Sequence, residues 1–145
     1  MPKLVRWEMP FTENRCPSVG LMISVQPGGA DLLQAIVAPF GIDRYPKYLI
    51  DFGNVIAFTC MEEAFSPQRD FDLSMFEEKN LSAYEYIDSP WLKSYENGID
   101  VLPGIGCLRH YLIFGGDSNI EIISRNTPTV KSIEEKCLLK SEREI

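Results

Sequence analysis

The chain has 145 residues, of which 45% are hydrophobic, and a formal net charge of −7. This length and apolar content suffice for one core, so we expect a single compact domain over residues 1–145, with residues 140–145 as a frayed charged tail. The acidic balance argues against nucleic acid and membranes as partners, because proteins bind those polyanions through clustered Lys and Arg.

The cysteine and N-terminal patterns bear on the compartment. The first eleven residues hold an acid and two prolines where a secretory signal has a basic start and a long apolar run. No apolar stretch approaches the roughly 20 residues that span a bilayer. The four cysteines are far apart, form no CxxC pair and are accompanied by one histidine. We therefore predict a cytoplasmic protein with reduced thiols and with neither metal nor cofactor.

The first third of the chain predicts strands at residues 3–9 and 21–26 and a helix at residues 31–38. The second strand ends at a Pro-Gly-Gly run, which punctuates regular structure. Leu32, Leu33, Ile36 and Val37 recur at the spacing of one helical face, and Pro39 ends the pattern.

Residues 47–60 are rich in aromatic and β-branched side chains, which favour strands. Gly53-Asn54 in their middle suits a tight turn, so we predict two antiparallel strands here. One long strand with a bulge at the glycine is the alternative.

Residues 62–80 are acidic and irregular, which predicts an exposed loop with one helical turn. A strand is expected at 81–87. Ser89-Pro90 then has the cap-plus-proline pattern of a helix start, and that short helix should end near 97–98.

The last part of the chain predicts a linker at 102–106, a hairpin at 108–123 and a final helix from Thr127 to about Leu139, on which Val130 and Ile133 share a face. Strands separated mostly by turns, with helices near both ends, indicate an α+β fold. We expect an antiparallel or mixed sheet with two or three short helices.

The hairpin holds the candidate site. A two- or four-residue loop around Gly116-Asp117 places His110 opposite Ile123 and Leu112 opposite Glu121. His110 and Glu121 then lie diagonally on one face within hydrogen-bonding reach, whereas an odd loop would separate them. A carboxylate that orients an imidazole is the pairing that a general base requires, so we assign both as candidate catalytic residues. The competing interpretation is a histidine that packs beside a polar neighbour.

Aromatic and acidic residues gather between positions 62 and 96. Aromatic side chains with polar tips recur at interfaces and also in cores. The candidate binding residues are Tyr86, Trp91, Tyr95, Tyr111 and Asp117, with Arg109 near the histidine; for Trp91 itself we prefer a core position.

Two functions follow from these observations. The leading hypothesis is a non-enzymatic protein-binding domain of the accessory or immunity type, which uses the 62–96 face to bind a basic protein or a second copy of itself. The alternative is an enzyme or small-ligand binder with its site at His110 and Glu121.

Three segments, YLIDFGNVIAFTCMEEAF, YEYIDSPWL and HYLIFGGDSNIEII, resemble in this order a pattern of small bacterial proteins of unknown function. The resemblance covers about half the chain, and the residues before Pro46 do not contribute. It implies a compact cytoplasmic α+β domain and supplies no catalytic residue or ligand.

Overall fold

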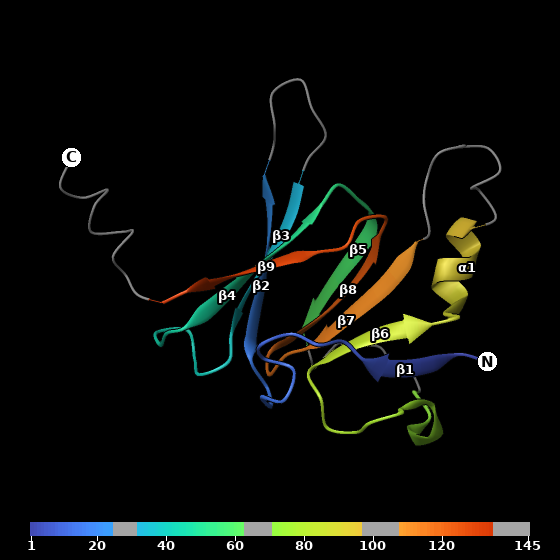
Figure 1. The fold of residues 1–145 in the computed structure, drawn as a ribbon, viewed down its shortest axis with the longest axis horizontal. Coiled ribbons are helices and arrows are strands. Elements are labelled where there is room, and N and C mark those ends of the chain that lie inside the picture. The colour runs from blue at the N-terminus through green and yellow to red at the C-terminus, as the bar shows by residue number, and fades with distance from the viewer. Residues whose placement is uncertain (25–31, 63–70, 97–107, 135–145) are drawn as a thin grey trace.

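The computed structural model describes residues 1–24, 32–62, 71–96 and 108–134 (Figure 1). These residues form nine strands in two antiparallel sheets, with one short α-helix, α1 (Pro90–Glu96), and one 3-10 helix, η2 (Leu73–Met75). The predicted α+β class is therefore wrong. The fold is mostly β.

Five strands form the larger sheet, in the order β1-β6-β7-β8-β5. Their bounds are β1 Lys3–Arg6, β6 Ala83–Ile87, β7 Arg109–Phe114, β8 Ser118–Ser124 and β5 Val55–Glu62. The smaller sheet has the order β2-β3-β4-β9, with β2 Ser18–Ser24, β3 Leu32–Ala38, β4 Lys47–Gly53 and β9 Thr129–Ile133.

The main core lies between the sheets. Inward side chains alternate along each strand with residues on the opposite face, as the period of two requires. This core comprises Trp7, Phe11, Val19, Leu33, Ala35, Val37, Ile50, Phe52, Ala83, Tyr111, Ile113, Ile120 and Ile122. Two smaller clusters cover the other face of the five-stranded sheet, one beneath α1 and one beneath residues 71–81. The described residues thus form three layers.

The two sheets meet at a corner where β4 runs into β5 and β8 runs toward β9. Lys47 faces Ile133 at one end of this ribbon and Glu62 faces Ser118 at the other, so the register is the same on both sides of the corner. Gly53, with φ of +67°, occupies the bend, and a bulge follows between Val55 and Ala57. The predicted hairpin at 47–60 is therefore wrong, because β4 and β5 pair with other strands and not with each other. The alternative of one long bulged strand is closer to the observed path.

The predicted helix at 31–38 is also wrong, because these residues form β3. Leu33, Ala35 and Val37 are buried in the core, and Ile36 lies on the opposite face. When both faces of a central strand are apolar, the spacing of its apolar residues also fits a helix. Residues 32–38 form a strand because they pair with β2 on one side and β4 on the other.

The predicted helix from Thr127 to Leu139 is likewise wrong over its described part. Val130 and Ile133 lie in β9, which pairs with β4. The rest of that prediction, and the linker at 102–106, fall outside the described residues.

Over the described residues the remaining element predictions are largely confirmed, while the predicted strand end at residue 26 and helix end near 97–98 fall outside those residues. β1 and β6 lie within the predicted strands at 3–9 and 81–87, and β2 begins three residues before the predicted start at 21. The single helical turn predicted within 62–80 is η2. Helix α1 begins after Ser89, whose Oγ accepts the Leu92 N–H at 2.9 Å, as an N-cap does.

Candidate functional site

The predicted register of the last hairpin is confirmed. His110 faces Ile123, Leu112 faces Glu121 and Phe114 faces Asn119 across β7 and β8. The loop closes with a hydrogen bond from the Gly115 N–H to the Ser118 carbonyl at 2.9 Å. His110 and Glu121 consequently lie on the face of the five-stranded sheet that α1 covers.

His110 is held at both ring nitrogens. Its Nε2 lies 2.8 Å from Glu121 Oε1, and its Nδ1 lies 2.7 Å from Ser89 Oγ. Because Ser89 Oγ already accepts the Leu92 N–H, its own hydrogen is available to Nδ1. In a neutral ring, the assignment that satisfies every atom places the proton on Nε2, which donates to the carboxylate, while Nδ1 accepts from the serine.

Aromatic rings enclose this histidine. The Tyr86 ring stacks on it at a centroid distance of 5.2 Å, and the Trp91 ring meets it edge to face at 5.3 Å. His110 and Ser89 have no exposed surface, and the Glu121 side chain is 15% exposed. Burial of this kind requires full hydrogen bonding, which the cluster achieves.

The arrangement has the residue types of a serine–histidine–acid triad, but its geometry is that of a structural clamp. A nucleophilic serine must present its Oγ to a substrate. Ser89 Oγ is buried and is already engaged with both the Leu92 amide and His110. The cluster instead joins the start of α1 to the start of β7, and the catalytic role of His110 and Glu121 stays a prediction.

Ser89 is the member of this cluster that the sequence did not reveal. Its cap-plus-proline pattern indicated a helix start and nothing about a partner 21 residues away. The available signal was the position of Ser89 on the short connection between β6 and α1. A serine there can accept from the helix and still donate its own hydrogen to a side chain of the sheet below.

The structure disperses the other candidate binding residues. Tyr86 and Tyr111 are buried, so they do not present a surface to a partner. Trp91 and Tyr95 are half-buried and pack against the cluster beneath α1. Asp117 is exposed in the turn between β7 and β8. Arg109 is exposed and forms an ion pair with Glu85 at 3.5 Å.

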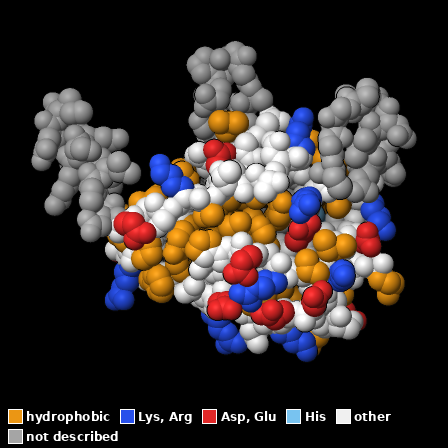
Figure 2. Space-filling model, viewed as in Figure 1, with side chains coloured by type: hydrophobic (Ala, Val, Ile, Leu, Met, Phe, Trp, Pro, Cys, Tyr) orange, Lys and Arg blue, Asp and Glu red, His pale blue; other side chains and the backbone are white. Residues whose placement is uncertain are grey.

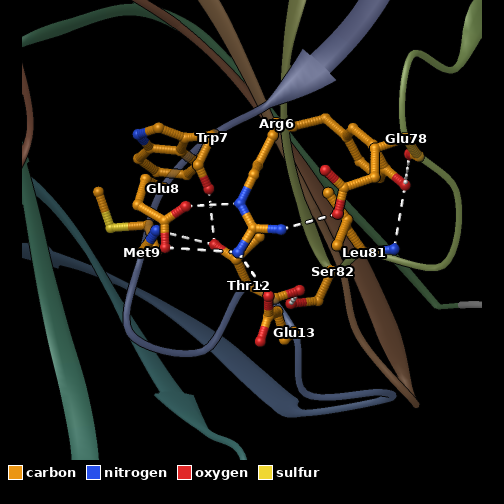
Figure 3. Close-up of polar contacts among 10 residues, drawn as sticks. Arg6, Trp7, Glu8, Met9, Thr12, Glu13, Glu78, Leu81 and Ser82 are labelled. Carbon is orange, nitrogen blue, oxygen red and sulfur yellow. Dashed lines mark hydrogen bonds and ion pairs between the residues drawn. The ribbon is translucent and has the colours of Figure 1, made fainter.

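Acidic side chains gather around Arg6 at the end of the edge strand β1 (Figure 3). Arg6 forms ion pairs with Glu8 and Glu13, which follow β1 in the chain, and with Glu78, which precedes β6. The hydrogen bond from Arg6 lowers the pKa of the Glu8 carboxyl. Three carboxylates around one guanidinium leave this surface negative, and the ion pair with Glu78 ties the segment before β6 to β1.

The outer face of the four-stranded sheet has no hydrophobic cluster of the described residues packed over it, unlike the outer face of the five-stranded sheet. Ile36 and Leu49 face each other at its centre, opposite in direction to the core residues. None of the hydrophobic clusters of the described residues includes them. Gly20 lies beside Ile36, and the position of a Cβ there is open space.

Further apolar side chains border this face. Met22 on β2 is 41% exposed, and Phe40 and Ile42 in the loop before β4 are exposed as well. Asp51 and Lys131 lie on the same face nearer its margin. Figure 2 shows hydrophobic side chains in a band that extends over β4 and the loop before it, above a cluster of acidic and basic side chains.

Comparisons with protein-family models, curated proteins and solved structures return no match. Within the described ranges, no group of three His, Cys, Asp or Glu side chains is placed to hold a metal ion. None of the helices in those ranges is long and apolar enough to cross a bilayer.

Proposed function

We propose that the protein acts without catalysis, by binding a basic protein through the outer face of the four-stranded sheet. The observation that carries this proposal is the apolar centre of that face, formed by Ile36 and Leu49 with Met22 beside them, over which no hydrophobic cluster of the described residues is built. An apolar centre with charged groups at its margin is the usual anatomy of a protein interface.

The net charge favours a basic partner over a second copy. A chain of charge −7 repels a copy of itself at long range and attracts a cationic protein, which raises the association rate. The apolar centre then supplies affinity after contact. We also infer a reducing compartment such as the cytoplasm, because Cys16 and Cys60 are exposed free thiols.

The His110 cluster supports the non-catalytic part of the proposal. Its serine and imidazole are buried, and their polar atoms are mutually satisfied. This arrangement favours a role in fixing α1 on the sheet.

The test begins with a photo-crosslinking amino acid placed at Met22 and, separately, at Met61. These two methionines are matched, because they are 41% and 40% exposed and lie on edge strands of different sheets. Capture of a protein at position 22 does not by itself show that it binds through this face. The protein captured at position 22 is purified, and its Kd is measured for wild type, Met22→Lys and Met61→Lys.

The proposal predicts a basic partner whose affinity falls at least about ten-fold in Met22→Lys and is unchanged in Met61→Lys. Its association rate should also fall as salt is added, because screening weakens long-range attraction. Equal effects of the two substitutions would overturn the assigned surface. Crosslinking only to a second copy, or to an acidic protein, would overturn the assigned partner.

A further inference from the structure

A second candidate site lies at the end of the five-stranded sheet where β6 begins and β7 ends. Two cavities adjoin there, of about 380 Å³ and about 390 Å³. They share Asn80, Leu81 and Phe114 in their walls, and these two adjoining cavities are together called the groove, with one cavity at each end. Each end lies in the size range of small-molecule sites.

One end of the groove is aromatic. Phe71, Phe76, Tyr84 and Phe114 line it, and their rings pack edge to face, with Phe76 and Tyr84 at 5.2 Å and Tyr84 and Phe114 at 5.7 Å. The Tyr84 hydroxyl donates to the Glu78 carbonyl and accepts the Leu81 N–H. Because that hydroxyl is occupied within the fold, Tyr84 offers the groove its ring and not a polar group.

The other end is polar and lies against the tight turn between β7 and β8. Arg15, Ser82 and Asn119 line it. Its floor depends on Gly115, where a Cβ would lie 2.4 Å from the Ser118 carbonyl oxygen and 2.9 Å from that of Pro17. The two glycines of the hairpin therefore allow the turn to close against residues 16 and 17, which shapes this end.

The charge of the groove is opposite to that of the chain. Its described lining includes Arg15 and Lys79 and no acidic side chain, although acids outnumber bases by 21 to 14 in the sequence. Both cations are exposed, and neither forms an ion pair with another described residue. A negative ligand group would thus meet two positive side chains in the described lining.

We propose that this groove binds a small aromatic carboxylate, with the aryl ring among Phe71, Phe76 and Phe114 and the carboxylate at the Arg15 end. Aromatic walls that pack edge to face suit a flat ring. An arginine offers a carboxylate paired N–H donors, which a lysine cannot. The inference does not depend on the protein-binding face, since the groove and that face share no residue.

The experiment titrates the ¹⁵N-labelled protein with phenylacetate, following the backbone amides of Leu81, Phe114 and Asn119. Phenylacetamide has the same ring without the charge, and hexanoate has the charge without the ring. Arg15→Gln removes the proposed anchor. Lys93→Gln is the matched control, because it removes one exposed positive charge on α1, outside the groove.

The proposal predicts saturable shifts at the groove amides with phenylacetate and at least about ten-fold weaker binding by Arg15→Gln, the cost of losing one charge-assisted contact. Lys93→Gln should bind as wild type does. Equal binding of phenylacetamide overturns the role of Arg15, and equal binding of hexanoate overturns the aryl assignment. Absence of saturable shifts overturns the site. Arg15 is an exposed loop residue, so the variant should retain the wild-type fold, which the spectrum itself reports.

Discussion

Replacing Ser89 with alanine tests the interpretation of the buried histidine most directly. The Ser89 hydroxyl makes two contacts, as the cap of α1 for the Leu92 amide and as the donor to His110 Nδ1. Loss of an N-cap costs about 1 kcal/mol of stability. Leaving a buried acceptor unpaired costs a further 1–3 kcal/mol or so. Ser89→Ala should therefore lower the free energy of unfolding by about 2–4 kcal/mol.

The assay is urea unfolding followed by tryptophan fluorescence and circular dichroism, in the wild-type and His110→Phe backgrounds. With phenylalanine at position 110 no acceptor remains, so Ser89→Ala should cost only the cap, about 1 kcal/mol. The difference between backgrounds is the coupling energy of the Ser89–His110 contact. A cost below about 0.5 kcal/mol in wild type, or the same cost in both backgrounds, would refute the clamp.

A second measurement covers the case in which His110→Phe does not fold. The side-chain ¹⁵N spectrum of His110 in the wild-type protein reports which ring nitrogen carries the proton. The hydrogen-bond pattern predicts protonated Nε2 and unprotonated Nδ1. The opposite tautomer would contradict the assigned direction of both bonds.

Three further predictions concern other parts of the chain. Gly115→Ala should strongly lower the melting temperature, because its Cβ would lie within 3 Å of two backbone oxygens. Gly20→Ala is the control and should leave the melting temperature nearly unchanged, because a Cβ there meets open space. Similar melting temperatures for the two variants would contradict the packing at the hairpin. Burial raises the pKa of the Tyr84 and Tyr111 phenols, so the stability that they contribute is complete below the unfolded-state value of about 10 and is lost as the pH rises through the higher folded-state pKa. In an alkaline titration by circular dichroism, unfolding should begin above about pH 10, and Tyr111→Phe should move the onset upward; an unchanged onset would argue against this cause. A fluorophosphonate probe should leave Ser89 unmodified in the folded protein, because its Oγ is buried, and mass spectrometry checks this. Labelling of Ser89 would support a catalytic role for the cluster.

Local sequence predicts part of the candidate site but not all of it. The relation between His110 and Glu121 follows from a tight turn and from the period of two along a strand, and both are local properties of residues 108–123. Ser89 completes the cluster from another part of the chain. Its contact with His110 exists because β6 pairs with β7 and places the start of α1 over that strand.

The sequence by itself determined the local features of this protein: the hairpin register, the cap of α1 at Ser89 and the acidic charge. These depend on turn chemistry, N-capping and composition, which act over a few residues. Only the tertiary structure decided that residues 32–38 form a strand and that residues 47–62 bend at Gly53 from one sheet into the other. The physical reason is that their apolar spacing fits more than one local structure, and the pairing strands that select among them come from distant segments of the chain.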